Sequence, residues 1–266
     1  MKYVSLTFDD GRNDNYYFAH SILRKYNMGA TLFCTTGFID GSFKKPEDWK
    51  SAGAPLTIEQ IKKMSEEGWE IALHGDQHIT ELEDCLKSIM KIRGMGFESN
   101  TFGFSVPNSE IPIDTFEKFK QELFPNKLKY IRCGRAIDTS KISSKLLFAA
   151  YTVAKTQKAF YIFNKKQVIS LTHFDASSIP SVVIRYNDDP KMILRFLENI
   201  PDNTWVVFMF HSILPKISSL YGSDPWNWST DCFEHLLTGI NNMKNISVKT
   251  MSDVLELAQV DGDYSG

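Results

Sequence analysis

The chain has 266 residues, of which 42% are hydrophobic, and its formal net charge is -2. This composition is ordinary for a globular protein, and the near-zero charge excludes the strongly basic surface that nucleic-acid-binding proteins present. No apolar run approaches membrane-spanning length, so we expect neither a nucleic-acid partner nor a membrane span.

The sequence begins directly with a strand pattern, without the basic segment, apolar run and cleavage site of a signal peptide. The four cysteines, Cys34, Cys85, Cys133 and Cys232, are widely spaced and form no CxxC pair. Such spacing is typical of reduced thiols rather than of a disulfide framework or a cysteine metal site. We therefore expect a cytoplasmic protein.

The N-terminal half alternates between strand and helix patterns. Residues 3–8 are rich in strand formers and are followed by two aspartates and a glycine. Further strands are expected at 30–34, 69–73, 101–106 and 128–132, and helices at 13–26, 55–67, 80–95 and 113–123. Residues 35–54 have the composition of a loop. Alternating strands and helices with short connections imply parallel strands covered by helices.

The C-terminal half is less regular. Its expected elements are a helix at 143–152, strand-like runs at 168–174 and 182–186, helices at 190–199 and 230–243, a strand at 246–250 and a helical turn at 252–258. Residues 204–210 form the most apolar strand, a pattern typical of a buried parallel strand. Residues 212–229 have the pattern of a long loop. We expect one domain over residues 1–258 and a polar tail over 259–266.

Polar side chains that can do chemistry follow several of the predicted strands. They are Asp9 and Asp10, His74 and His78, Arg132, and His211. In parallel α/β architectures the carboxyl ends of the strands share one edge, and ligands bind at that edge. We therefore expect these side chains to lie together.

Asp9 and Asp10 are adjacent, so both can face one site only if the strand has ended and the chain is turning at Gly11. Two close carboxylates repel each other, and a metal ion would offset their charge. An Asp-Asp-Gly sequence alone is also common turn chemistry. Together with His74 and His78, however, a strand-end carboxylate forms a set of three ligands for a divalent metal.

These motifs resemble the polysaccharide deacetylase family, also called NodB-homology or carbohydrate esterase family 4 deacetylases. The matching residues are Thr7-Phe8-Asp9-Asp10-Gly11, the pair His74-xxx-His78, and the strand that ends in His211. The segments leading into them, 29–33 and 68–74, also resemble the family, and the likeness covers roughly residues 3–135 and 201–258. The resemblance implies a deformed (β/α) barrel of about seven parallel strands.

The resemblance also implies a role for each of these residues. Asp10, His74 and His78 would hold one divalent metal, zinc or another such as Co²⁺, Ni²⁺ or Mn²⁺. Zinc with three protein ligands lowers the pKa of a bound water to about 7. Asp9 would be the general base for that water. His211 would be the general acid that protonates the leaving amine, a task that suits the unperturbed histidine pKa of about 6.5.

The third motif of the family, Arg-x-Pro-aromatic, appears here as Ser105-Val106-Pro107-Asn108 and lacks both the arginine and the aromatic residue. Another arginine after a later strand can take that place. We predict that Arg132 orients Asp9, with Arg135 as the second candidate. An arginine beside Asp9 would keep the carboxyl group ionised, as a base must be.

Two further roles have candidates. The family pairs its acid histidine with an aspartate, for which Asp138 and Asp175 are available. Of the two tryptophans Trp226 and Trp228, we expect one to pack the loop and one to line the site as a platform for a sugar. The predicted substrate-lining residues are Trp226, Pro107 and Arg135.

The sequence therefore predicts a metal-dependent hydrolase that removes N-acetyl groups from a sugar or glycan precursor. Two alternatives remain open. One is a metal-independent hydrolase of cyclic amides or imides on the same scaffold. The other is a catalytically inactive glycan-binding module, which the altered third motif keeps under consideration.

Overall fold

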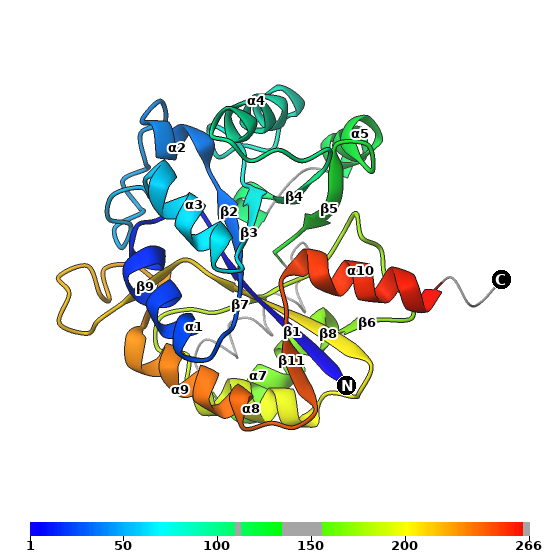
Figure 1. Ribbon diagram of the computed structural model, residues 1–266. Coiled ribbons are helices and arrows are strands. Elements are labelled where there is room, and N and C mark those ends of the chain that lie inside the picture. Colours follow the sequence, from blue (N-terminus) through cyan, green and yellow to red (C-terminus); the bar gives the residue numbers. More distant parts are fainter. Residues whose placement is uncertain (110–112, 135–155, 263–266) are drawn as a thin grey trace.

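The computed structural model describes residues 1–109, 113–134 and 156–262, with the remaining residues drawn in grey in Figure 1. The expected helix at 143–152 lies outside the described residues, as do Arg135 and Asp138. None of the helices in the described ranges has the length and apolar character that a membrane crossing requires.

A curled sheet of mostly parallel strands forms the centre of the molecule, with helices around it (Figure 1). Its main path is β5 (Leu128–Arg132), β4 (Phe102–Ser105), β3 (Glu70–Leu73), β2 (Thr31–Cys34), β1 (Lys2–Phe8), β8 (Thr204–Phe210) and β6 (Ile169–Ser170). In addition, β7 (Val182–Val183) pairs with β8, and β11 (Ile246–Val248) pairs with β1. The predicted fold class, a deformed (β/α) barrel, is confirmed.

Strand β1 lies at the centre of this sheet. It pairs in parallel with β8 along its whole length, from Lys2 opposite Thr204 to Phe8 opposite Phe210. On its other side, β11 pairs with its first residues and β2 with its last. The residues that follow β1 and β8 therefore emerge side by side at the carboxyl edge of the sheet.

Aromatic side chains pack the core directly beneath that edge. The ring of Phe8 lies 5.1 Å from Trp69, 5.4 Å from Phe210 and 5.8 Å from Phe233 between ring centroids. These residues come from β1, the position just before β3, strand β8 and helix α9 (Thr230–Asn241), and all four are buried. Close-packed aromatic rings leave the strand ends little freedom to shift.

The longer helices are α3 (Ile58–Glu66), α4 (Leu82–Gly94), α5 (Ile113–Leu123), α7 (Gln157–Asn164), α8 (Pro190–Asn199), α9 (Thr230–Asn241) and α10 (Met251–Gly262). Shorter elements are η1 (Asn15–His20), α1 (Ser21–Lys25), α2 (Thr36–Asp40), η2 (Pro107–Ser109) and η3 (Lys165–Gln167). Helix α3 begins with a reciprocal capping box formed by Thr57 and Gln60.

The structure corrects several expected elements. The segment 35–54, expected as a loop, contains α2, which is fixed by long-range backbone bonds from Thr36 N to Gly75 O and from Gly37 N to Asp76 O. The segment 212–229 contains a parallel pair, β9 (Ser212–Leu214) with β10 (Asn227–Ser229). Strands this short carry no periodic signal in the sequence, and the same holds for β6, which replaces the longer run expected at 168–174. Helix α7 was not expected, and α10 extends beyond the expected closing turn.

Candidate active site

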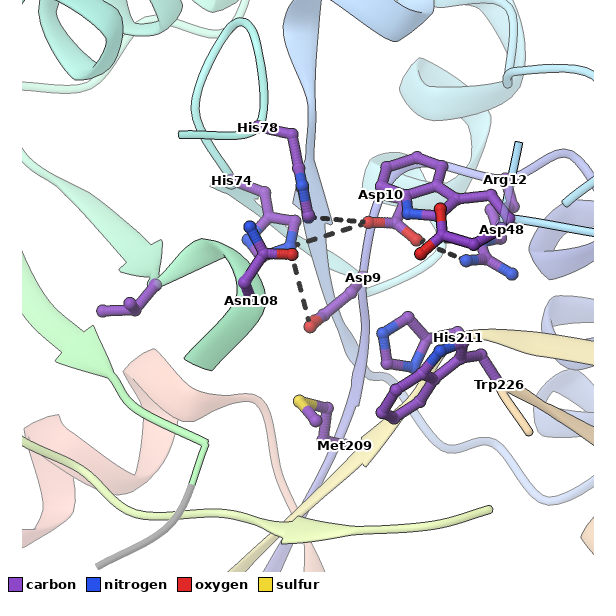
Figure 2. Close-up of a pocket in the computed structure, with 12 residues that line it drawn as sticks. Asp9, Asp10, Arg12, Asp48, His74, His78, Asn108, Met209, His211 and Trp226 are labelled. Atoms are coloured by element: carbon purple, nitrogen blue, oxygen red, sulfur yellow. Dashed lines mark hydrogen bonds and ion pairs between the residues drawn. The ribbon is translucent and has the colours of Figure 1, made fainter. Parts of the chain in front are cut away.

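A cavity of about 160 Å³ opens at the carboxyl edge of the sheet. Figure 2 shows the side chains of Asp9 and Asp10 at its centre, with His74 and His78 on one side and His211 and Trp226 on the other. The strand-end residues that the sequence singled out are thus brought together. They come from β1, from the loop after β3, and from the end of β8.

The chain turns one residue earlier than the expected turn at Gly11. Asp10 itself has a left-handed backbone with φ of 76°, and Gly11 follows with φ of 84°. This conformation is uncommon for a residue other than glycine, although aspartate is among those that adopt it most readily. Because the chain turns at Asp10, this side chain no longer points to the opposite face from Asp9, as it would in a continuing strand. Both carboxylates therefore reach the cavity.

The carboxylate of Asp10 faces both imidazoles. Its Oδ1 lies 3.6 Å from Nε2 of His74 and 3.6 Å from Nε2 of His78. Donors bound at about 2.0–2.2 Å in a tetrahedral zinc site lie roughly 3.4 Å from each other, so this spacing suits one cation. Oδ1 of Asp10 is also buried without a hydrogen-bond partner among the described residues. The three residues therefore fit a divalent metal.

The imidazoles are held in the form that metal binding needs. Nδ1 of His74 lies 2.9 Å from the backbone oxygen of Ser105, so it donates its proton there and leaves Nε2 facing the cavity. Burial lowers the pKa of His74 to about 4, and burial together with the neighbouring His74 lowers the pKa of His78 to about 4. Both rings are therefore neutral near pH 7, as ligation requires.

The loop between the two histidines is shaped by one buried carboxylate. Asp84 accepts hydrogen bonds from the backbone N–H groups of Asp76 and Gln77, both at 2.8 Å. Gly75 has φ of 79°, and a Cβ at that position would lie 2.4 Å from the Asp84 carboxylate. The loop ends at His78, whose φ of 56° turns its ring back toward His74.

Asp9 is paired with Arg132, the arginine that we predicted to orient it. The guanidinium of Arg132 donates to Oδ2 of Asp9 at 2.6 Å, while Oδ1 of Asp9 is buried without a hydrogen-bond partner among the described residues. Arg132 also donates to the hydroxyl groups of Ser105 and Ser181 and lies 4.8 Å from the centre of the Phe33 ring. Ser105 occupies the position at which the family motif has its arginine. Its hydroxyl accepts a hydrogen bond from Arg132, which ends the neighbouring strand β5.

Sequence reasoning missed a second arginine, Arg12. Its Nε and one terminal nitrogen each lie 2.8 Å from Oδ2 of Asp10, and the other terminal nitrogen donates to Ser51 and Ser212. Burial alone would raise the pKa of Asp10, but Arg12 and then the nearby histidines bring it well below its usual range. The sequence signal that could have pointed to Arg12 is its position two residues after the candidate ligand Asp10.

His211 lies across the cavity from the paired imidazoles, partly exposed, with its ring 5.0 Å from that of Trp226. Burial lowers its pKa to about 4, against the opposing effect of the Asp10 and Asp9 carboxylates. The side chain of Asn15 donates to the backbone oxygen of His211 at 2.7 Å and fixes the end of β8.

The expected aspartate partner of His211 is not found in the described part of the chain, where Nδ1 of His211 is buried without a hydrogen-bond partner. Of the two candidates, Asp175 instead accepts hydrogen bonds from the backbone and the hydroxyl of Ser177. The other candidate, Asp138, lies outside the described residues.

The two tryptophans of the 212–229 segment have different surroundings. Trp226 lines the cavity, whereas Trp228 is buried and donates its indole N–H to the backbone oxygen of Asp188 at 2.8 Å. Pro107 is buried and does not itself line the cavity, although its neighbours Val106 and Asn108 do. Arg135, the third residue predicted to line the site, lies outside the described residues. Sequence reasoning missed Asp48, Trp49 and Met209, which also line the cavity.

Comparisons with known proteins find similarity in the N-terminal part of the chain. Residues 1–101 match the polysaccharide deacetylase family. A putative polysaccharide deacetylase of Bacillus subtilis, YxkH, is 39% identical over 80 residues, a match that spans 29% of this chain and about a quarter (24%) of that protein's length.

Solved structures extend the likeness in fold to nearly the whole chain. The family 4 acetyl xylan esterase of Clostridium thermocellum, solved with a cobalt ion, has a TM-score of 0.52 at 14% identity and covers 96% of this chain and 91% of its own. The CE4 domain of a xylanase from the hindgut metagenome of Trinervitermes trinervoides has a TM-score of 0.52 at 13% identity. The alignment covers 97% of this chain and 91% of that domain. The match to the polysaccharide deacetylase family thus covers residues 1–101, and over the rest of the chain the likeness is one of fold.

Proposed function

We propose that this protein is a divalent-metal-dependent hydrolase that removes the acetyl group from an N-acetylated sugar or glycan precursor. The observation that carries the proposal is the placement of Asp10 Oδ1, buried and 3.6 Å from Nε2 of both His74 and His78. Beside it, Oδ1 of Asp9 has no hydrogen-bond partner within residues 1–109, 113–134 and 156–262 and can accept a proton. The match of residues 1–101 to the polysaccharide deacetylase family supports the same reaction.

Asp10, His74 and His78 would hold the cation. A zinc ion or another divalent cation bound there would polarise the amide carbonyl and lower the pKa of a water molecule to about 7. Asp9 is the general base for that water, through the Oδ1 atom, which has no hydrogen-bond partner in the described part of the chain. Arg132 holds the other oxygen of Asp9 at 2.6 Å and stabilises the ionised carboxylate before the proton is transferred.

His211 completes the reaction from the opposite side of the cavity. The water oxygen bonds to the carbonyl carbon, the C–N bond breaks, and the imidazolium of His211 gives a proton to the departing nitrogen, so the products are acetate and a free amine. Burial keeps the pKa of His211 at about 4, while the carboxylates of Asp10 and Asp9 oppose that effect. Negative charge that develops on the carbonyl oxygen adds to this opposition and favours the protonated ring at the moment of transfer.

The shape of the cavity suits a small acyl group on a larger polar substrate. Its volume of about 160 Å³ leaves room for little more than an acetamido group, and Val106 and Met209 contribute apolar lining. Trp226 is only partly buried and offers a ring face at the rim, as expected for a side chain that contacts a sugar.

A test is to load the purified protein with Zn²⁺ or Co²⁺ and measure acetate release from N-acetylglucosamine oligomers and other N-acetylhexosamine derivatives. We expect release that a chelator stops and that added metal restores, and no release by D9N. Absence of acetate from every substrate with loaded protein would contradict the proposal. In that case, sugar binding that is equal in wild type and D9N would favour a binding module, and chelator-insensitive opening of a cyclic imide would favour the metal-independent alternative.

A further inference from the structure

Arg12 is a buried cation at the wall of the active-site cavity. Its side chain is 1% exposed, and two of its nitrogens approach the same oxygen of Asp10, each at 2.8 Å. This leaves only Oδ1 of Asp10 facing His74 and His78. The guanidinium thus decides which carboxylate oxygen is available to a cation.

The remaining nitrogen of Arg12 reaches two separate segments of the chain. It donates to the hydroxyl of Ser51 at 3.0 Å and to the hydroxyl of Ser212 at 2.9 Å. Ser51 lies two residues after Trp49, and the backbone N–H of Ser212 bonds to the backbone oxygen of Trp226 at 3.1 Å. Both tryptophans line the cavity. We call the segments 49–51 and 212–226 the two rim segments.

The rim segments are also tied to each other and to the ligand set. The carboxylate of Asp224 accepts from the backbone N–H of Ser51 at 2.6 Å. Arg12 lies 5.3 Å from the centre of the Trp49 ring, and that ring packs edge-on against His78 with centroids 4.7 Å apart. Arg12 therefore contacts the candidate ligand Asp10 directly and reaches the candidate ligand His78 through Trp49.

A second buried carboxylate completes the chain of polar contacts. The hydroxyl of Ser212 accepts from Arg12 and donates to Asp14 at 3.1 Å, and Asp14 also accepts from the backbone N–H of Ile213 at 2.8 Å. A buried arginine is tolerated only when its charge is paired and its donors are bonded, and all three nitrogens of Arg12 have partners here. Such a network holds one geometry rather than several.

We propose that Arg12 is a positioning residue that restricts Asp10 to a single donor oxygen and couples the metal centre to the two rim segments. The inference rests on the proposed function, since it concerns the same site. It predicts two separable effects. The contacts with Asp10 govern metal affinity, whereas the contacts with Ser51 and Ser212 govern how the tryptophans meet the substrate.

The test compares three changes with a matched control. R12Q removes the charge, and R12K keeps the charge but loses the planar guanidinium with its several donors. The double variant S51A/S212A keeps the contacts with Asp10 and removes the rim contacts, together with the hydrogen bond from Ser212 to Asp14. R24Q is the control, because Arg24 is an exposed arginine (62%) paired with Glu67 away from the cavity. The measurements are the Zn²⁺ Kd by calorimetry, the visible absorption of bound Co²⁺, and KM and kcat for acetate release.

For R12Q we expect a Zn²⁺ Kd weakened by about 10- to 100-fold, the range found when a partner of a metal ligand is removed, together with an altered Co²⁺ spectrum. R12K should recover part of the affinity. S51A/S212A should raise KM several-fold while its Zn²⁺ Kd stays near that of the wild type, and R24Q should match the wild type throughout.

Wild-type Zn²⁺ affinity and an unchanged Co²⁺ spectrum in R12Q would overturn the inference while leaving the proposed function intact. If R12Q does not fold, R12K with wild-type affinity and spectrum would overturn it equally. If S51A/S212A leaves KM unchanged, the coupling to the rim segments is refuted. If the wild-type chain binds no metal, the proposed function fails, and the inference fails with it.

Discussion

Two regions around the centre of the cavity, which we call the Asp9 side and the Asp10 side, each pair a buried carboxylate with an arginine, but the two arginines come from different parts of the chain. On one side Asp9 is paired with Arg132, 123 residues away in the sequence, and on the other Asp10 is paired with Arg12, two residues away. Each arginine occupies one carboxylate oxygen and leaves the other buried without a hydrogen-bond partner among the described residues. The difference lies in what the free oxygen faces. Oδ1 of Asp10 faces two imidazoles, as the oxygen of a metal ligand would. Oδ1 of Asp9 accepts no hydrogen bond from the described residues, which suits a general base.

The supports of the two arginines also differ. Arg132 ends strand β5 and lies against the Phe33 ring, so its position depends on the sheet. Arg12 follows the β1 turn and bonds to Ser51 and Ser212, so its position depends on the rim segments. The Asp9 side is therefore held by the rigid core, and the Asp10 side by segments that also meet the substrate.

The largest expected effect separates the two aspartates. D10N removes a charged ligand, and we expect Zn²⁺ binding and acetate release to be lost together. D9N removes the base, and we expect kcat to fall by roughly 10²- to 10⁴-fold while the Zn²⁺ Kd stays within a few-fold of the wild type. Calorimetry and the acetate assay on the same preparations check both. Zinc binding by D10N at wild-type affinity would refute this division of roles.

A smaller effect is expected for the arginine of the Asp9 side. R132Q should lower kcat by about 10- to 100-fold, because the base loses its orientation, and it should leave the Zn²⁺ Kd nearly unchanged. The D9N/R132Q double variant should be no slower than D9N alone, since both changes act through one carboxylate. Kinetics with R24Q as the matched control measure this. Additive losses in the double variant would show that Arg132 acts independently of Asp9.

The three histidines of the cavity predict how the free energy of unfolding depends on pH. Burial lowers the pKa values of His74, His78 and His211 to about 4, whereas the unfolded chain binds these protons near pH 6.5. Between these values the unfolded state holds more protons, so the free energy of unfolding should fall as the pH decreases from about 6.5 to about 4. Asp14 and Asp84 oppose this trend, because burial raises the pKa of each, that of Asp14 to about 7. Burial also lowers the pKa of His20, so four imidazoles act against two carboxyl groups.

Urea unfolding in chelator-containing buffer at a series of pH values tests this prediction. H211N should make the dependence on pH shallower, because one of the three groups is removed. A free energy of unfolding that stays constant or rises as the pH falls through this window would contradict the assigned environments of the histidines.

The smallest effect on activity is expected at the rim. W226A should raise KM a few-fold with little change in the free energy of unfolding, because Trp226 is only partly buried. W228A, two residues away, should instead cost about 3–5 kcal/mol of stability, because Trp228 is buried in the core. Urea unfolding and kinetics on both variants make this comparison. A large loss of stability in W226A with unchanged KM would assign Trp226 to packing alone.

Most of the fold and of the central site could be predicted from the sequence because both follow from local signals. Apolar runs ending in Asp10, His74 and His211 mark buried parallel strands, and the carboxyl ends of such strands share one edge. The pairing of Arg132 with Asp9 came from the family resemblance and from the position of Arg132 at a strand end.

The supporting contacts could not be predicted in the same way. Nothing in the sequence distinguishes a buried arginine after a turn from an exposed one, so the role of Arg12 became visible only with Ser51 and Ser212 beside it. Strands β9 and β10 are three residues each and pair across a long excursion of the chain, which leaves no periodic pattern. Trp49 lies in a segment without regular structure and reaches the cavity through tertiary packing alone.

The most direct test of the central claim is anomalous diffraction at the zinc edge from crystals grown with Zn²⁺. The account predicts one strong peak in the cavity, at about 2.0–2.2 Å from Oδ1 of Asp10 and from Nε2 of both His74 and His78. A cavity without anomalous signal, or a zinc ion bound only by other residues, would contradict it.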